Sequence, residues 1–432
     1  MKVKINPDAK IVFDGYLGAI GIDKKTQLKI KTKDEKRQFL LWLANEGDFC
    51  YNIGKIDKKY FKELLEKGFL VLEKGGGKKY SLENKRIFKE EIEKLPNKRS
   101  KGPVLMSICI TSECNLRCRH CGNDSGLLSK SKLTFDEVKN IVDQASELST
   151  MKLTITGGEP LLHKDFFSIL DYCYEKIPRL GLTSNGFLIN EKNIKKIKNK
   201  LDVLKISLDG LENFHDDFRG REGSFKRAIN AIKKSVEEGI ETRVQMTLTR
   251  ENTSDVKQLI EKLNNLMVKR ISIVPIVPTG RATCNMMLKP LEYRRFVLDL
   301  IDHIKNINLN SEIEIRPFFT LINNSTLKKP NIIGNKYHCE ALRSSIDILP
   351  NGDVIPCSFL NKKIGNVKTE RIEDIWNSKE AEEFRSQLDN VKNLSECKDC
   401  KFNNLCEGGC VATKLAISGV VGRDVYCWGC SK

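Results

Sequence analysis

Residues 111–121 read Thr-Ser-Glu-Cys-Asn-Leu-Arg-Cys-Arg-His-Cys and directly follow an apolar stretch that is typical of a strand. Cys114, Cys118 and Cys121 therefore share one loop, in the spacing C-x3-C-x2-C. Three thiolates on one loop can ligate three irons of a cubane cluster and leave the fourth iron open. Structural zinc usually takes four protein ligands, and we expect the nearby Cys109 to pack in the core instead. The spacing therefore predicts an iron–sulfur cluster at the end of a strand.

From Val104 to about Arg316, short apolar runs alternate with amphipathic stretches, a pattern typical of repeated βα units. The predicted strands are Val104–Thr111, Lys152–Thr156, Leu180–Thr183, Val203–Leu208, Thr242–Thr249 and Arg270–Val277. The predicted helices are Thr134–Leu148, Asp165–Lys176, Glu191–Lys200, Ser224–Glu238, Thr253–Leu266 and Pro290–Lys305. A closed barrel needs eight units, so this α/β core is expected to be a partial (β/α)6 barrel or an open parallel sheet. In either arrangement the loops after the strands carry the site.

Two further regions flank this core, residues 104–316. Residues 1–75 predict a winged-helix-like module, with strands at Lys10–Phe13, Leu17–Ile22 and Leu28–Lys31 and helices at Asp34–Ala44 and Asp57–Lys67. A last strand at Phe69–Glu73 is expected to pair with Lys79–Leu82, just beyond the module's end. Residues 76–103 predict a basic linker. Residues 317–432 hold eight cysteines and one amphipathic helix around Ile372–Asn390. Because this last region can bury little apolar surface, it needs a metal to hold it.

The composition bounds the class of protein. The chain has 432 residues, of which 40% are hydrophobic and 30% charged, which indicates a folded protein of about two to four domains. No apolar run approaches the roughly 20 residues of a membrane span, and no signal-peptide core follows Met1, so we expect a cytoplasmic protein. The net charge of +17 suits an acidic partner. No base-reading motif accompanies that charge, and nucleic acid is therefore not expected as the substrate.

The fifteen cysteines carry most of the functional information. In a reducing compartment, clustered cysteines indicate metal ligation or catalysis and not disulfides. Three lie within residues 114–121 and six within residues 397–430. Cys50, Cys173 and Cys284 stand alone, and each is expected to be a small buried apolar side chain.

Four short motifs follow the predicted strands in turn. They are the three-cysteine loop, Gly157-Gly158-Glu159-Pro160, Thr183-Ser184-Asn185-Gly186, and Ser207-Leu208-Asp209-Gly210 with the following His215-Asp-Asp-Phe-Arg219-Gly220. Glycines let backbone approach a ligand closely, and a glutamate can accept a hydrogen bond from an ammonium group. With these motifs in this order, the core resembles the radical S-adenosylmethionine (SAM) superfamily.

The resemblance implies that the open iron chelates the amino and carboxylate groups of SAM, and that reductive cleavage yields a 5′-deoxyadenosyl radical. It also implies a set of SAM contacts. These are Gly157, Gly158 and Glu159 at the amino group, Ser184 and Asn185 after the third strand, Ser207 and Arg219 at the ribose or carboxylate, and His120 beside the adenine. Residues 278–282, Pro-Thr-Gly-Arg-Ala, resemble a further stretch of the family. For Asn185, His215 and Arg281, loop capping is the alternative role.

The C-terminal cysteines also follow a known order. Cys339 precedes Gly352-x4-Cys357, and Cys397-x2-Cys400-x5-Cys406-x3-Cys410 is followed by Cys427 and Cys430. This order resembles the SPASM domain, which implies two auxiliary 4Fe–4S clusters. By that resemblance the first cluster uses Cys339, Cys357 and Cys410, and the second uses Cys397, Cys400, Cys406 and Cys427. Two alternatives stay open: the first cluster keeps an open iron or takes His338, and Cys430 competes with Cys427.

The three regions together resemble maturases of ribosomally synthesised and post-translationally modified peptides. The resemblance implies that the N-terminal module binds the leader of a precursor peptide by adding it as an edge strand. It also implies hydrogen abstraction from the peptide and a C–S (thioether) or C–C crosslink, with reduced ferredoxin or flavodoxin as the electron donor. The residue that accepts the proton is not predicted.

Three other functions are weighed against this one. Sulfatase-type maturases carry an aspartate after the G-x4-C cysteine, and here Ser358 follows Cys357. Small-molecule SPASM enzymes that act on haem precursors would not need the N-terminal module, although that module can also be a simple cap. An iron–sulfur redox sensor that binds DNA would not need the SAM motifs.

Overall fold

The structure is a computed structural model of the 432-residue chain. It describes residues 2–5, 9–14, 18–23, 29–32, 49–50, 64, 70–73, 100–128, 130–316, 332–333, 339–360, 362–400 and 403–427. Within these residues, no helix is both long and apolar enough to cross a lipid bilayer.

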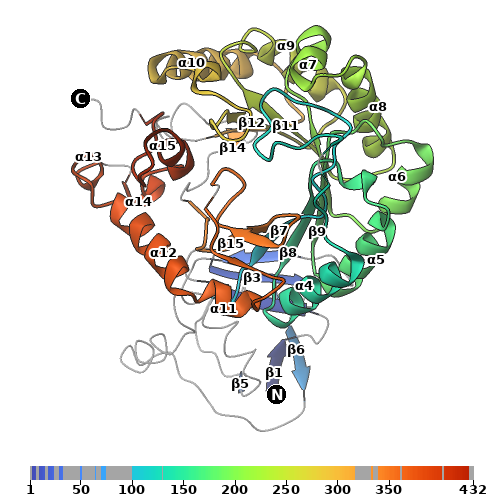
Figure 1. Ribbon diagram of the computed structural model, residues 1–432, viewed down its shortest axis with the longest axis vertical. Helices are drawn as coiled ribbons and strands as arrows, with labels where there is room; N and C mark the ends of the chain where they lie inside the picture. Colours follow the sequence, from blue (N-terminus) through green and yellow to red (C-terminus); the bar gives the residue numbers. More distant parts are fainter. Residues whose placement is uncertain are drawn as a thin grey trace.

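A curved, mostly parallel sheet forms the centre of the molecule (Figure 1). Its described strands lie in the order β14-β13-β12-β11-β10-β9-β8-β7-β15-β16-β17. The six predicted strands are β7 (Leu105–Cys109), β8 (Lys152–Thr156), β9 (Leu180–Ser184), β10 (Val203–Ser207), β11 (Thr242–Leu248) and β12 (Arg270–Pro275). Each pairs in parallel with its neighbour, so the predicted parallel α/β core is confirmed.

The sheet extends beyond these six strands at both sides. On one side it continues in parallel through β13 (Glu312–Ile315) and β14 (Ile332–Ile333). On the other side β15 (Ser345–Ile348) pairs in parallel with β7, and β16 (Asp353–Ile355) and β17 (Gly365–Asn366) follow in antiparallel pairing. The C-terminal region is therefore joined to the core through the first core strand.

Seven helices cover the outer side of the curved sheet in the described core (Figure 1). They are α4 (Phe135–Glu147), α5 (Phe166–Lys176), α6 (Glu191–Ile197), α7 (Glu212–Arg219), α8 (Ser224–Glu237), α9 (Val256–Asn265) and α10 (Pro290–Asn306). All but α7 were expected. Helix α4 begins where the sequence predicts, because the Thr134 hydroxyl accepts a hydrogen bond from the Glu137 backbone N–H in a capping box.

The main core lies between the sheet and these helices. Strand β11 illustrates how one face of the sheet enters this core, because its buried residues alternate with half-buried ones along its length. Val244 and Met246 face the helices and are fully buried, as are Ile155 on β8 and Ile206 on β10. The other face of each strand carries polar side chains and points to the inside of the curve. Two short 3-10 helices, Pro160–Leu162 and Cys284–Met286, lie in the loops at the strand ends.

In the C-terminal region the prediction of one continuous helix at Ile372–Asn390 is wrong, because two helices occupy this stretch. Helix α11 (Ile372–Trp376) ends before Ser378, whose hydroxyl accepts a hydrogen bond from the Ala381 backbone N–H and caps α12 (Lys379–Val391). Three short helices follow: α13 (Ser395–Lys398), α14 (Asn403–Cys406) and α15 (Val411–Ser418).

The N-terminal segment contains two described antiparallel sheets. One has the order β2-β3-β4, with strands Ala9–Asp14, Gly18–Asp23 and Lys29–Thr32, where three strands were predicted. The other has the order β5-β1-β6, with strands Phe49–Cys50, Lys2–Ile5 and Leu70–Glu73. The described partner of β6 is thus β1. The predicted helix at 34–44, the strand at 79–82, most of the linker and all of the helix at 57–67 except Leu64 lie outside the described residues, and Leu64 is helical and fully buried.

Candidate active site

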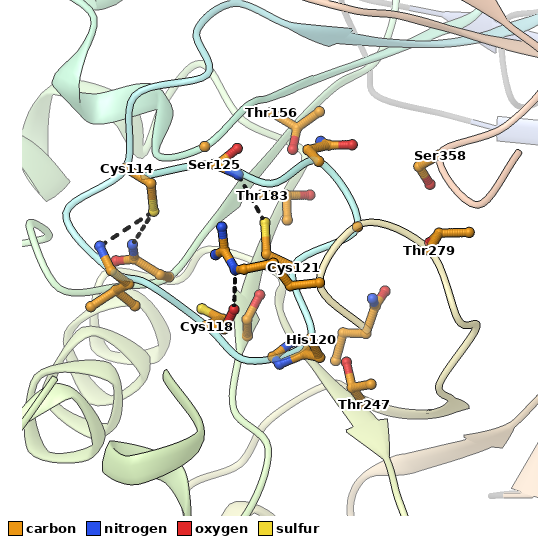
Figure 2. A pocket seen from close by; sticks show the side chains of 18 of the residues that line it. Cys114, Cys118, His120, Cys121, Ser125, Thr156, Thr183, Thr247, Thr279 and Ser358 are labelled. Atoms are coloured by element: carbon orange, nitrogen blue, oxygen red, sulfur yellow. Dashed lines mark hydrogen bonds between the residues drawn. The ribbon is translucent and has the colours of Figure 1, made fainter. Parts of the chain in front are cut away.

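A cavity opens at the carboxyl ends of the parallel strands, where the sequence predicts the site (Figure 2). Of the predicted contacts, those lining it are Cys114, Cys118, His120, Cys121, Gly157, Gly158, Ser184, Asn185, Ser207 and Arg219. Residues that were not assigned a role there also line it: Gln245 and Thr247 on β11, Thr279, and Ser358 and Phe359 from the C-terminal region. The structure therefore brings together residues from all six core strands or the loops that follow them.

The cysteine loop is fixed by hydrogen bonds from segments far away in the chain. The backbone N–H of Arg119 donates to the Phe218 carbonyl over 2.8 Å, and the Arg281 Nε donates to the Cys118 carbonyl over the same distance. The Sγ of Cys121 accepts a hydrogen bond from the Ser125 backbone N–H at 3.3 Å. Burial raises the pKa of the Cys114 thiol to about 12. Iron binding must therefore displace a proton from this thiol.

The two glycines at 157–158 are required by a close approach of two loops. A Cβ added to Gly158 would lie 2.2 Å from the Glu113 carbonyl oxygen, a distance that no side chain tolerates. The backbone N–H of Gly158 donates to the Thr111 carbonyl over 2.7 Å, and that of Glu159 donates to the Glu113 carbonyl over 2.8 Å. The glycine turn is thus tied directly to the start of the cysteine loop.

Glu159 has a different place from the one expected. Its side chain is fully buried and does not line the cavity. The carboxylate accepts hydrogen bonds from the Ser184 hydroxyl at 2.9 Å and from the Asn185 backbone N–H at 2.8 Å. Burial raises its pKa to about 7, although these hydrogen bonds oppose the shift. Glu159 positions the loop after β9, while its direct contact with the SAM amino group stays a prediction.

A buried ion pair lies under the cysteine loop. The Nε and Nη2 atoms of Arg219 donate to one oxygen of Asp209, over 2.7 and 2.6 Å. The Nε2 of His120 lies 3.6 Å from the same oxygen, and its ring stacks on Phe218 with centroids 4.3 Å apart. Burial alone would raise the pKa of Asp209, but the charges of Arg219, His120 and His215, together with a hydrogen bond from the Thr247 backbone N–H, outweigh it and the pKa falls to about 2. Much of the hydrogen-bonding capacity of Arg219 is therefore directed at Asp209.

Several buried polar atoms around the cavity have no partner within the described part of the chain. They are the Nδ1 of His120, the Oγ of Ser125 and the Nη2 of Arg281, and all three residues line the cavity. Buried polar atoms normally find a hydrogen-bond partner, so their arrangement fits a polar ligand. A nucleoside carrying an amino acid, such as SAM, offers suitable donors and acceptors. The residues present therefore fit the cofactor that the resemblance implies.

The C-terminal cysteines fall into two groups in space. The pKa of Cys357 is raised by burial and then by the negative charges of Asp347, Cys339 and Cys410. The pKa of Cys397 is raised by burial and by Cys427 and Cys400, and that of Cys406 rises to about 12 through burial and Cys427. These charge effects agree with two neighbourhoods of cysteines, and the exact ligand sets of the two auxiliary clusters stay predictions. Cys430 and His338 lie outside the described residues.

These groups are not arranged around a single ion. Among the described residues, no three histidine, cysteine, aspartate or glutamate side chains are placed to hold one metal ion. In a cubane each thiolate binds a different iron, so its ligands need not converge on one point.

Two family models match the chain. Residues 108–263 match the radical SAM superfamily, and residues 339–401 match SPASM, an iron–sulfur cluster-binding domain. The AdoMet-dependent heme synthase of Methanosarcina barkeri is 27% identical over 76% of this chain and 96% of its own length. The antilisterial bacteriocin subtilosin biosynthesis protein AlbA of Bacillus subtilis is 26% identical over 76% of this chain and 71% of its own.

A solved structure matches almost the whole length of the chain. The crystal structure of Streptococcus suis SuiB bound to precursor peptide SuiA superposes with a TM-score of 0.68 at 24% identity. The match covers 99% of this chain and 100% of SuiB, so the two proteins share a fold from the N-terminal segment to the C-terminal region.

Proposed function

Because this chain belongs to the radical SAM superfamily and carries a SPASM domain, we propose that it is an enzyme that crosslinks a ribosomally made precursor peptide. The product would be a thioether or a C–C bond. The observation that carries the proposal is the shared fold with SuiB over the full length of both chains, since SuiB was crystallised with its precursor peptide. AlbA, a bacteriocin biosynthesis protein, supports it from the sequence side.

The cofactors follow from the family and from the cysteine groups. A radical SAM enzyme uses SAM and a 4Fe–4S cluster, and we propose that Cys114, Cys118 and Cys121 hold that cluster. We propose two auxiliary clusters for the two C-terminal groups, making three in all. When bound, SAM and the reduced cluster supply a 5′-deoxyadenosyl radical that takes a hydrogen atom from the substrate. Reduced ferredoxin or flavodoxin would supply the electron in the cytoplasm.

The residues of this chain orient the cofactor and exclude water. The glycine turn leaves room for backbone contact with the SAM amino group, and Glu159 fixes Ser184 and Asn185 beside it. The Nη2 of Arg281 is a buried donor at the cavity wall without a partner in the described region, which suits a carboxylate. Phe359 from the C-terminal region lines the same cavity and helps to shield it from water.

A second candidate is a haem-forming reaction on a small molecule. It is favoured by the heme synthases, which match about three quarters of this chain and nearly their own whole length. About a quarter of this chain has no counterpart in that match. The first candidate gives the N-terminal segment a task, the binding of a leader peptide, and the second does not.

Deletion of residues 1–75 tests the choice. The probe is the short peptide encoded beside the gene, labelled with a fluorophore. We expect the truncated enzyme to lose most of its affinity for this peptide, because strand addition needs an exposed sheet edge. Cleavage of SAM without peptide should persist, since every proposed SAM contact lies between Cys114 and Arg281, and this activity also reports that the core is folded. Equal affinity for the peptide with and without residues 1–75 would contradict leader binding by this segment.

A further inference from the structure

The inner face of the sheet continues below the cavity as a row of basic side chains. Thr156 and Thr183 line the cavity at the ends of β8 and β9 (Figure 2), and Ser207 lines it at the end of β10. Side chains alternate along a strand, so every second residue before these three shares their face. On β10 that residue is Lys205, and four positions before the other two are Lys152 and Arg179. Lys152 lies on β8 and Lys205 on β10, and Arg179 directly precedes β9. The charges of Lys205 and Arg179 both act on Lys152, so the three cations lie near one another.

The contacts of these side chains place them on that face. The Cε of Lys152 would lie 3.7 Å from a Cβ at Gly181, so its chain passes over this glycine of β9. The Nζ of Lys205 donates to the Oε1 of Gln245 over 3.3 Å, and Gln245 lines the cavity. The backbone carbonyl of Arg179 accepts from the Leu153 N–H at 3.0 Å, which keeps Arg179 in the ladder beside β8. Lys205 thus contacts a residue of the cavity wall, although none of the three basic side chains lines the cavity itself.

The three cations lack the carboxylate partners that other basic residues of this sheet have. Arg270 on β12 is paired with Glu312 at 2.7 Å, and Arg243 on β11 is paired with Glu241. Within the described residues no ion pair reaches Lys152, Arg179 or Lys205, and the Nε of Arg179 is buried without a hydrogen-bond partner. Unpaired cations in a half-buried position are costly unless an anion joins them.

The electrostatics of the two lysines agree with this geometry. The pKa of Lys152 is lowered to about 7 by burial and then by the charges of its basic neighbours, against a weaker opposite effect of Glu340. The pKa of Lys205 is lowered to about 8 by burial and then by Arg316, while Glu314 and Asp347 oppose the shift. The charged groups that act on Lys152 are Lys205, Arg179, Arg243 and Glu340. Those that act on Lys205 are Arg316, Glu314, Arg243 and Asp347. A bound anion would relieve the repulsion among the cations.

We propose that Lys152, Arg179 and Lys205 form a carboxylate-binding site for the substrate. The inference rests on the proposed function, in which the substrate is a peptide and its anionic groups are carboxylates. The site lies beneath the cofactor cavity, so a carboxylate held there fixes the residue that is presented to the radical. The arginine supplies a bidentate fork and the lysines supply point charges. The source is an aspartate or glutamate side chain or the peptide's C-terminal carboxylate, and the test separates the two.

The first test measures binding without turnover. The probes are three tripeptides with blocked N-termini: one with a central glutamate and an amidated end, one with glutamine in its place, and one of glycine with a free C-terminus. Each is added at saturation, and acetylation of individual lysines by acetic anhydride is followed by mass spectrometry. We expect at least one of the two carboxylate probes to slow modification of Lys152 and Lys205 about tenfold or more relative to the glutamine probe. The exposed Lys176 on α5 is the matched control and should react equally with all probes.

The pattern of protection decides the outcome. Protection by the glutamate probe supports the site and assigns a side-chain carboxylate, whereas protection by the free C-terminus alone supports the site and assigns the peptide end. Equal protection by all three probes overturns the proposal. This measurement does not require the enzyme to modify a peptide, so it distinguishes failure of the site from failure of the proposed function.

The second test uses the full-length enzyme and its precursor peptide. We expect Lys152→Gln and Lys205→Gln to raise KM by about tenfold, and Lys205→Arg to restore most of it because the charge is kept. Replacing the bound acid of the peptide by its amide should raise the KM of the native enzyme about as much as the lysine substitutions do. In the lysine variants the same peptide change should raise KM little further. Fully additive effects of the two changes would overturn the proposal. Failure of the native enzyme to modify any peptide would instead contradict the proposed function.

Discussion

The cysteine loop at 114–121 and the C-terminal cysteines at 397–427 are built in opposite ways. The first loop is held by hydrogen bonds to Phe218 and Arg219 at the end of α7 and to Arg281 after β12, all in the parallel core. In the second region most backbone hydrogen bonds of the cysteines are local, such as those from Cys400 to Cys397 and from Gly409 to Cys406, and Cys410 adds one to the Asp424 side chain of the same region. We therefore expect the first site to keep its shape without metal and the second site to depend on metal for its shape.

Secondary structure strengthens this contrast. The first loop follows a strand that is paired on both sides, with β8 and with β15. The cysteines at 397, 400 and 406 lie in or beside helices of four residues each, α13 and α14, which are too short to be stable alone. Loss of the first cluster should therefore stop chemistry and leave the fold, while loss of the second should also loosen the fold.

The largest expected effect is on SAM cleavage. Replacing Cys114, Cys118 and Cys121 together by alanine should remove about four of roughly twelve irons and abolish formation of 5′-deoxyadenosine. The circular dichroism spectrum should stay native, because the loop is held by backbone hydrogen bonds that the thiols do not make. Iron analysis and an anaerobic assay with dithionite check this result. Cleavage of SAM by the triple variant would contradict the radical SAM assignment of this loop.

The matching change in the second region should separate cleavage from product formation. Cys397→Ala or Cys400→Ala should lower the iron content by about four and stop peptide modification, while some uncoupled SAM cleavage remains. The variant is informative when it is soluble, and Cys173→Ala, at an isolated buried cysteine on α5, is the control for general destabilisation. Full peptide modification by a soluble variant without the second cluster would contradict the role that we propose for it.

The sequence predicts the parts of the fold that depend on local patterns and misses those that depend on contacts between distant segments. Strands β7 to β12 follow directly from the local alternation of apolar and amphipathic stretches. The pairing of β15 with β7 does not, because it joins segments from opposite ends of the core and local periodicity carries no record of such contacts. Helix α7 also goes unrecognised, since Phe214 and Phe218 are the two large apolar residues of an otherwise polar stretch. The break between α11 and α12 depends on one capping serine.

The site shows a similar division. Spacing alone brings the three loop cysteines and the glycine turn to one cavity, because parallel strands end at the same edge. The role of Glu159 is not predicted, since only the structure shows that Ser184 and Asn185 use its carboxylate. The ion pair of Asp209 and Arg219 could have been predicted from the sequence. Asp209 in the motif 207–210 and Arg219 in the motif 215–220 carry opposite charges. The sequence does not predict the basic row, because its members come from three separate segments of the chain.

Removal of iron should reveal the contrast as a difference in local stability. After treatment with a chelator and an oxidant, amide hydrogen exchange followed by mass spectrometry should show loss of protection in residues 395–427. Strands β7 to β12 should keep their protection, because their hydrogen bonds lie in a packed sheet. A C-terminal region that is equally protected with and without iron would contradict a metal-dependent fold.

The smallest effect concerns the buried pair beneath the first loop. Asp209→Asn leaves the Arg219 guanidinium buried without its carboxylate, and loss of one partner from a buried pair costs about 3–5 kcal/mol in the free energy of unfolding. Urea denaturation at neutral pH measures this loss. The control is Asp217→Asn, because Asp217 pairs with Arg119 at the surface and such pairs contribute about 0–1 kcal/mol.

The pH dependence of this difference has a definite sign. The pKa of Asp209 lies at about 2 in the folded protein, below its ordinary value of 3.8, so the folded state favours the ionised form. The stabilisation is therefore complete above about pH 4 and is lost as the pH falls through about 2. The asparagine variant has no such group, so the gap between the two proteins should be widest at neutral pH and narrow in acid. A gap that is constant from pH 7 to the acid limit of folding would show that packing, and not the ion pair, sets the stability of the first loop.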